Sequence, residues 1–168
     1  EVVLGQTPFY AESGGQVGDT GWLHGPDGHV IVDDVQRIAG TVVHRGWVEE
    51  GRVARGETLR AVVDADRRDD IRRNHTATHL LHAALQEILG EHAQQRGSLV
   101  APDRLRFDFA HLRSLEPEQL ERIERRVNAL VRADLPVLAH QTSMAEARAE
   151  GAMMLFGEKY GDVVRVVS

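Results

Sequence analysis

Two histidines near the middle of the chain, His75 and His79, stand four residues apart. On an α-helix this spacing places both imidazoles on one face, one turn apart, where they can chelate a single zinc ion. Zinc peptidases with this spacing carry a glutamate directly after the first histidine as general base, but here the intervening residues are Thr76-Ala77-Thr78. The pair therefore predicts a zinc site and argues against peptidase chemistry. Because the chain has nine histidines, a merely polar helix face is the alternative.

His82 lies three residues beyond His79 and extends the same stripe. This position allows a third zinc ligand, a residue that orients a ligand, or a polar side chain that covers the site. We favour the second and third of these roles. The chain has no cysteine, so it supplies neither a thiolate ligand nor a thiolate nucleophile and forms no disulfide.

The helix that carries the stripe is expected to begin at Asp64-Ala65-Asp66 and to run to about Leu89. The two acids suit a helix N-terminus, where carboxylates cap free amides and face the dipole. Gly90 suits the C-terminal end. Residues at three- and four-residue spacing predict the buried face, which comprises Ile71, Thr78, Leu81, Leu85 and Ile88.

Residues 1–63 contain many glycines and short segments in which apolar and polar residues alternate. This pattern is typical of β-strands joined by tight turns. Turns are expected at 26–28, 50–51 and 55–56. We therefore predict a glycine-rich, β-barrel-like subdomain, either a small barrel or a curled sheet.

Helical and strand patterns are mixed after residue 64. Residues 105–109 alternate apolar and polar side chains, which predicts a strand with one buried face. A helix is expected to begin near Pro117, and its apolar face comprises Leu120, Ile123, Val127, Leu130 and Val131.

Three short elements complete the pattern. Residues 136–141 are predicted to form a strand, Ser143 and Glu146 a capping box for a brief helix ending near Gly151, and residues 162–167 a buried strand. The predicted fold class is therefore α+β. It divides into a β-barrel-like domain over 1–63 and a mixed helix and antiparallel-sheet domain over 64–168, packed directly together.

The composition is that of a folded, soluble protein of 168 residues, with 42% hydrophobic and 27% charged residues. No apolar run approaches the roughly 20 residues of a membrane span, and the N-terminus lacks the basic region of a signal peptide. We therefore expect a cytoplasmic protein that is not bound to membranes. The formal net charge of −6 repels a polyanion at long range, so nucleic-acid binding requires a local basic face.

Arginines on the first turns of the long helix are the candidates for such a face: Arg67, Arg68, Arg72 and Arg73. Arg72 and Arg73 lie closest to His75, and we predict that they contact nucleic-acid phosphates. Acidic residues interleave with these arginines at 66, 69 and 70. The alternative is therefore a solvated face held by ion pairs within the helix.

The glycine-rich segment Thr7–Asp19 resembles a motif of alanyl-tRNA synthetase editing domains and of their free-standing relatives. Residues 74–85 resemble the zinc-binding helix of that family, and residues 95–100 resemble the segment that follows it. Two further segments, 106–109 and 151–160, come in the same order as in the family. The likeness covers essentially the whole chain.

The resemblance implies zinc as the cofactor, held by His75 and His79 and by a cysteine and a histidine of a later Cys-Gly-Gly-Thr-His type segment. That segment is expected shortly beyond Ser168, so the chain would be a C-terminally truncated fragment with half of the site. Zinc takes about four ligands in structural sites. Two imidazoles should therefore hold it weakly or not at all, and protonation should abolish binding at acid pH.

The activity that the resemblance implies is hydrolysis of the ester that joins serine or glycine to wrongly charged tRNA(Ala). It assigns Thr78 and Gln95 to the amino-acid pocket, where a hydroxyl and an amide can recognise the serine hydroxyl that alanine lacks. Gln16 is the third candidate catalytic residue, because a glycine-rich turn lets the backbone approach a ligand. Each of these has a structural alternative, such as a bond from Thr78 to its own helix. Zinc would orient the substrate or activate water.

The implied partners are mischarged tRNA(Ala) and the remaining domains of the parent synthetase, which hold the acceptor stem. The chain by itself is expected neither to bind ATP nor to activate alanine. Two alternatives belong to other classes: a non-catalytic nucleic-acid-binding or interaction module, and an unrelated zinc hydrolase.

Overall fold

The computed structural model describes residues 1–152 and 161–167. Over these residues helices and antiparallel sheets are combined, which confirms the α+β class. The greater part of the resemblance segment 151–160 lies outside the described residues. Among the described helices, none combines the length and the hydropathy that a membrane span requires.

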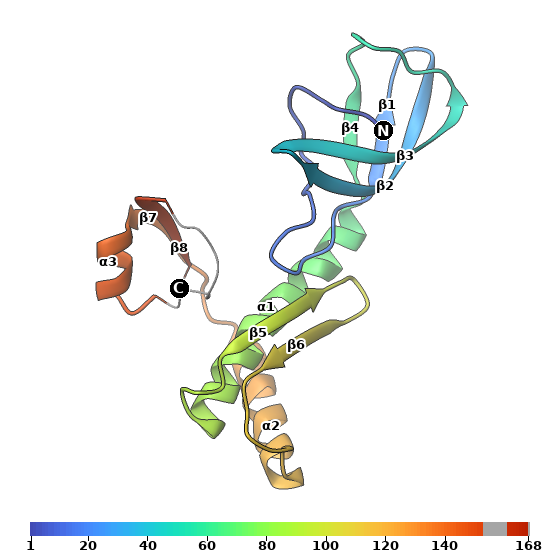
Figure 1. The fold of residues 1–168 in the computed structure, drawn as a ribbon. Helices are drawn as coiled ribbons and strands as arrows, with labels where there is room; N and C mark the ends of the chain where they lie inside the picture. Colours follow the sequence, from blue (N-terminus) through green and yellow to red (C-terminus); the bar gives the residue numbers. More distant parts are fainter. Residues whose placement is uncertain (153–160, 168) are drawn as a thin grey trace.

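The N-terminal sheet has four antiparallel strands: β1 (Gly21–His24), β2 (Gly28–Ile38), β3 (Thr41–Gly51) and β4 (Arg60–Val63). Their order is β3-β2-β1-β4. In the described residues β3 and β4 do not pair, so the sheet is curled but not closed, as Figure 1 shows, and the barrel alternative is wrong. The turn predicted at 50–51 is also wrong, because β3 continues to Gly51 and pairs there with Gly28.

The core of this sheet is formed by the alternating apolar residues of β1 and β2 together with the preceding segment. Leu23, Val32 and Val35 are almost fully buried. The rest of this buried cluster comprises Phe9, Ala11 and Val30. The segment before β1 is thus part of the packed structure although it contains no regular strand.

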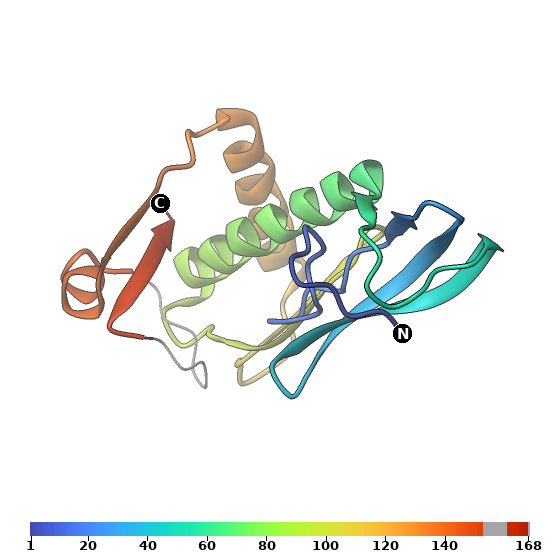
Figure 2. The same ribbon diagram turned by 90° about the horizontal axis from the view of Figure 1, so that it is seen from above.

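The long helix α1 (Ala65–Leu89) has the bounds that its capping residues predict. The Asp64 side chain accepts a hydrogen bond from the Arg67 amide at 3.1 Å, and Gly90 is the C-cap. Figure 2 shows α1 as the axis of the molecule, with the N-terminal sheet beside its first turns.

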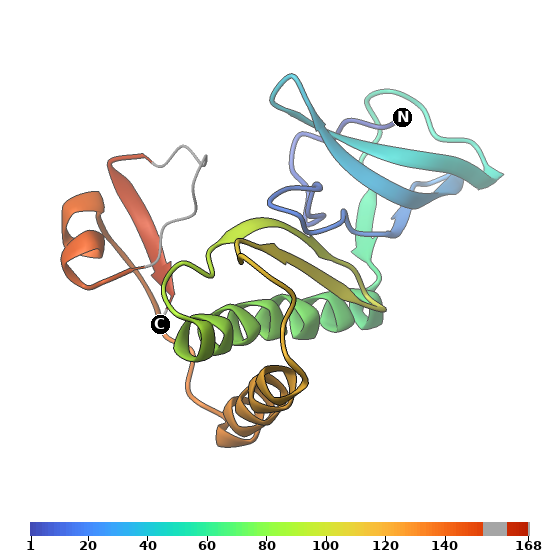
Figure 3. The same cartoon turned by 60° about the horizontal axis from the view of Figure 1, so that its bottom comes forward.

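A hairpin of β5 (Gln95–Val100) and β6 (Leu105–Phe109) lies along α1, and α2 (Pro117–Ala133) packs below it in Figure 3. Ala84 and Leu85 of α1 are buried with Ile123 of α2. The α2 face is only partly covered, because Leu120 and Val131 are 53% and 57% exposed.

The last described elements are β7 (Ala139–Ser143), α3 (Met144–Ala149) and β8 (Val163–Val167). The strand predicted over 136–141 begins three residues later, and the capping box of Ser143 and Glu146 is present. The strand expected over 162–167 forms, but its predicted burial is wrong, because Val163 and Val167 are 66% and 60% exposed. Figure 1 shows β7, α3 and β8 as a unit beside the rest of the fold.

Candidate functional site

The glycine-rich segment Thr7–Asp19 meets the hairpin edge beside α1. The Val100 amide donates to the Gly15 carbonyl at 2.8 Å, and the Val17 amide donates to the Val100 carbonyl at 3.1 Å. Gly15 has a φ of +82°, and a Cβ there would lie 2.4 Å from Oγ and 2.5 Å from the carbonyl oxygen of Ser98. Only glycine allows this approach.

The first turn of α1 anchors the other end of the segment. Arg67 Nη1 donates to the Gly18 carbonyl at 2.9 Å. Arg68 forms an ion pair with Asp19, whose side chain is 2% exposed, and Asp19 also accepts from the Tyr10 amide at 2.6 Å. Arg67 and Arg68 are therefore partly buried and engaged in contacts within the fold, and their part in a basic face stays a prediction.

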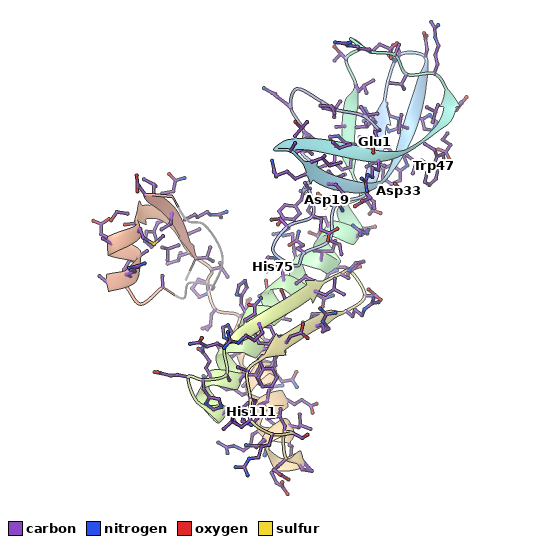
Figure 4. The ribbon with its side chains drawn as sticks, in the orientation of Figure 1. Glu1, Asp19, Asp33, Trp47, His75 and His111 are labelled. Atoms are coloured by element: carbon purple, nitrogen blue, oxygen red, sulfur yellow. The ribbon has the colours of Figure 1, made fainter. Side chains whose placement is uncertain are left out.

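His75 contacts the glycine-rich segment through Gln16. Its Nδ1 is 2.6 Å from Oε1 of Gln16, from which it is separated by 59 positions in the chain. Burial lowers the pKa of His75, and the neighbouring His79 lowers it further. The His75 ring is therefore neutral at pH 7, the form that binds metal. Figure 4 shows His75 on α1, between Asp19 and His111.

The two predicted metal ligands share one helix face. The ring centroids of His75 and His79 are 5.1 Å apart and the planes are inclined by 22°. An amide oxygen can only accept, so this contact is a hydrogen bond in the tautomer that carries its hydrogen on Nδ1 and leaves the lone pair on Nε2. The donors fit zinc by type, as two of about four ligands. Within residues 1–152 and 161–167, no group of three histidine, aspartate or glutamate side chains could hold a metal.

His82 is buried between α1 and β6, with an exposed fraction of 5%. Its ring lies 5.1 Å from the Phe107 ring. Burial lowers the pKa of His82, as does His79, whereas a hydrogen bond with the Ala93 backbone opposes the shift. In the described structure the Nε2 atom has no hydrogen-bond partner. His82 thus extends the stripe into the core and keeps a neutral ring.

The predicted pocket residues are placed differently from each other. Thr78 is 5% exposed, and its hydroxyl donates to the Asn74 carbonyl at 2.8 Å. Gln95 begins β5, next to a register irregularity, and its Nε2 donates to Ser98 Oγ at 3.1 Å. Gln95 thus lies next to the glycine-rich segment through Ser98, whereas the Thr78 hydroxyl bonds to its own helix.

Two site residues were not foreseen from the sequence. Ser98 Oγ links Gln95 to the Gly14 carbonyl, which it reaches at 3.5 Å. Asn74 Nδ2 donates to the Ala101 carbonyl at 2.7 Å and so ties α1 to the end of β5. Both lie in segments that the resemblance covers, but only the fold shows what they contact.

Arg72 and Arg73 are exposed on α1, with side chains 75% and 72% accessible. They form ion pairs within the helix, Arg72 with Asp69 at 2.9 Å and Arg73 with Asp70 at 2.7 Å. These pairs are the ion pairs within the helix that a solvated face would have, but exposed ion pairs contribute little to stability. Both guanidinium groups can therefore exchange a carboxylate for a phosphate.

The chain resembles known proteins over its whole length. Residues 1–67 match the family model for class II (A) tRNA synthetases. The chain is 62% identical over 169 residues to an alanine--tRNA ligase of Roseiflexus castenholzii, covering 100% of the chain and 19% of that protein. Alanine--tRNA ligases of Thermus thermophilus and Cereibacter sphaeroides are 58% and 54% identical, again over 19% of their length and 99% and 100% of the chain. The chain therefore aligns along its length with a segment that makes up 19% of each of these alanine--tRNA ligases.

Proposed function

We propose that this segment is the editing region of an alanine--tRNA ligase and that it hydrolyses the ester of serine or glycine on wrongly charged tRNA(Ala). The observation that carries the proposal is the contact between Gln16 and His75. It joins the glycine-rich motif to the predicted zinc-binding helix, two segments that the family resemblance selects independently. The relatives that match over the chain are named alanine--tRNA ligases, which supports the parent enzyme of this proposal.

The proposed roles follow from the chemistry of each side chain. His75 and His79 would hold zinc, which when bound polarises a carbonyl or lowers the pKa of water. The proposed hydrolysis breaks the acyl carbon–oxygen bond, so that the water oxygen ends in the carboxyl group of the released amino acid and the tRNA oxygen regains its hydrogen as the terminal hydroxyl. Gln95 would orient the amino acid, because an amide oxygen can accept a hydrogen bond from the substrate while Nε2 binds Ser98.

Discrimination against alanine is proposed to depend on hydrogen bonds to the serine hydroxyl. A site built to bond a hydroxyl rejects a substrate that lacks it, because its own polar groups would stay unpaired. The Thr78 hydroxyl already donates to Asn74, so it could serve only as an acceptor at its remaining lone pairs. Gln95 is therefore the stronger candidate for recognition.

Binding of the tRNA is proposed to involve Arg72 and Arg73, since both are exposed near the predicted metal ligands. The remaining domains of the parent enzyme would hold the acceptor stem. We also propose a domain boundary at residue 64, where the Asp64 cap separates β4 from α1.

The direct test is deacylation of seryl-tRNA(Ala), with alanyl-tRNA(Ala) as the discriminating substrate and His75→Ala as the control variant. The 168-residue chain would be assayed with added zinc, alongside the Roseiflexus castenholzii enzyme in which this chain replaces the corresponding segment. We expect weak or no release of serine by the chain alone and selective release by the chimera, lost with His75→Ala.

A chimera that charges tRNA(Ala) normally, yet releases serine no faster than the His75→Ala chimera, would contradict the proposal. If such a chimera still needed this segment to bind tRNA, the non-catalytic binding module would be the better description.

A further inference from the structure

Gln16 was predicted to face the substrate, but its side chain is engaged elsewhere. Its Oε1 lies 2.6 Å from Nδ1 of His75, a short hydrogen bond in a partly buried setting. A residue whose polar end is bonded to a predicted metal ligand acts on the substrate only through that ligand.

The bond selects one of the two neutral forms of His75. A carboxamide oxygen has lone pairs and no hydrogen, so it can only accept. Nδ1 must then carry the ring hydrogen, and Nε2 presents a lone pair. Histidine ligands in metal sites generally donate their other ring hydrogen in this way, which fixes the ring and makes the ligating nitrogen more basic.

Hydrogen bonds hold the backbone around Gln16 on two sides, so its side-chain carboxamide starts from a fixed position. The Gln16 amide donates to the Ser13 carbonyl at 3.0 Å, and the Ser13 amide donates back to the Gln16 carbonyl at 3.2 Å. On the other side, residues 15 and 17 bond to Val100 of β5. The absence of a Cβ at Gly15 is what lets this turn reach Ser98.

The glycine-rich segment itself is fixed to the same helix that carries the histidine. The buried ion pair of Asp19 with Arg68 and the bond of Arg67 to Gly18 attach the segment to the first turn of α1. His75 follows Arg68 by about two helical turns. The segment is thus attached to α1 at Gly18 and Asp19, and the bond between the Gln16 oxygen and His75 Nδ1 is a further contact between the two.

We propose that Gln16 is a positioning residue, which holds His75 in the Nδ1–H form and thereby presents Nε2 to zinc. The inference rests on the proposed zinc site of the editing region and gives the glycine-rich segment a specific part in it. Through Gln16, the glycine-rich segment places a hydrogen-bond acceptor next to a predicted metal ligand on α1. Gln16 then contributes to zinc binding without touching the amino acid or the metal.

The test reads the tautomer of His75 directly, by ¹⁵N NMR of its ring nitrogens in the 168-residue chain at pH 7.5 without metal. The native chain should show hydrogen on Nδ1 and a bare Nε2. Gln16→Met removes the acceptor at similar size and should give a mixture of both forms. Gln16→Glu keeps an acceptor-only group and should retain the native form.

Zinc affinity, measured by titration with zinc alone, is the second readout. Loss of an orienting partner costs about 10–100-fold in metal affinity, so we expect that loss for Gln16→Met and none for Gln16→Glu. Gln36→Met is the matched control, because Gln36 Nε2 binds Glu12 of the same segment at 2.7 Å without a contact to His75. It should leave both readouts unchanged.

Three results would overturn the inference: a native His75 with hydrogen on Nε2, an unchanged tautomer in Gln16→Met, or an equal loss of zinc affinity in Gln36→Met. Where the two-imidazole site binds zinc too weakly for comparison, the tautomer decides alone. Neither readout involves deacylation, so a chain without editing activity can still pass this test, and an active one can fail it.

Discussion

The buried ion pair between Asp19 and Arg68 offers a sharp test of how the N-terminal sheet is attached to α1. Asp19 is 1% exposed and accepts hydrogen bonds from Tyr10 and Arg68. Asp19→Ala removes these bonds and leaves the Arg68 guanidinium without its carboxylate partner, with the bond to the Pro8 carbonyl remaining. Breaking a buried pair by removing one partner costs about 3–5 kcal/mol.

The lower end of that range applies here, because the Arg68 side chain is 34% exposed and can turn partly to water. We therefore expect Asp19→Ala to lower the free energy of unfolding by about 3 kcal/mol. At roughly 2–4 °C per kcal/mol for a chain of this size, the melting temperature should fall by about 6–12 °C.

The assay is urea unfolding followed by circular dichroism, with Asp103→Ala as control. Asp103 pairs with Arg104 at 2.7 Å, but both side chains are about two-thirds exposed, at 64% and 65%. An exposed pair of this kind contributes about 0–1 kcal/mol. If the two variants lost the same free energy at an unchanged denaturant slope, the anchoring role of Asp19 would be refuted.

Three further changes test other contacts. Burial lowers the pKa of His44, and a hydrogen bond to the Val2 backbone opposes this shift. Because the unfolded chain then binds a proton more readily than the folded one, the free energy of unfolding should fall as the pH drops below about 6.5. Urea unfolding at pH 7.5 and pH 5 should show this loss of stability, and His44→Gln should reduce it. Gly15→Ala should cost about 2–4 kcal/mol, because the new Cβ meets Ser98, whereas Gly40→Ala, at nearly the same φ of +83° but with open space, should cost only about 1–2 kcal/mol in a melting experiment. Arg72→Gln should weaken tRNA binding and reduce the salt dependence of the logarithm of affinity by about one; an unchanged slope in filter binding would exclude a phosphate contact.

Local chemistry explains why α1 was predicted with its correct bounds. The Asp64 cap and the Gly90 stop act within one turn of the helix ends, so the sequence nearby contains the whole signal. The same holds for the capping box of Ser143 and Glu146. Helix bounds that are set by contacts within one turn can therefore be predicted from the sequence.

β5 was missed because its sequence carries no strand signal of its own. The segment Gln95–Val100 includes an arginine, a glycine and a serine. It becomes a strand because it pairs with β6 and because Val100 forms backbone hydrogen bonds with the glycine-rich segment. Strand formation of this kind depends on tertiary context more than on propensity. The contact of Asp19 with Arg68, 49 positions away, was hidden for the same reason.

The resemblance selected the candidate site residues, but their contacts needed the fold. Spacing alone put His75 and His79 on one face, which the ring geometry confirms. It could not show that His82 is buried against Phe107, or that Gln16 contacts a histidine 59 positions later. Such facts depend on how the segment folds back onto α1.

The use of the arginines bears on how the proposed reaction can be selective. Arg67 and Arg68 hold the glycine-rich segment, and the chain has a net charge of −6. Non-specific affinity for a tRNA grows with the number of phosphates that are neutralised, so the two arginines Arg72 and Arg73 would supply only a small part of it. On the proposed function, this segment would contribute shape and orientation at the reacting ester, and the affinity would come from the other domains of the proposed parent enzyme. A weakly binding site can then release correctly charged tRNA quickly, because it retains only what its hydrogen bonds recognise.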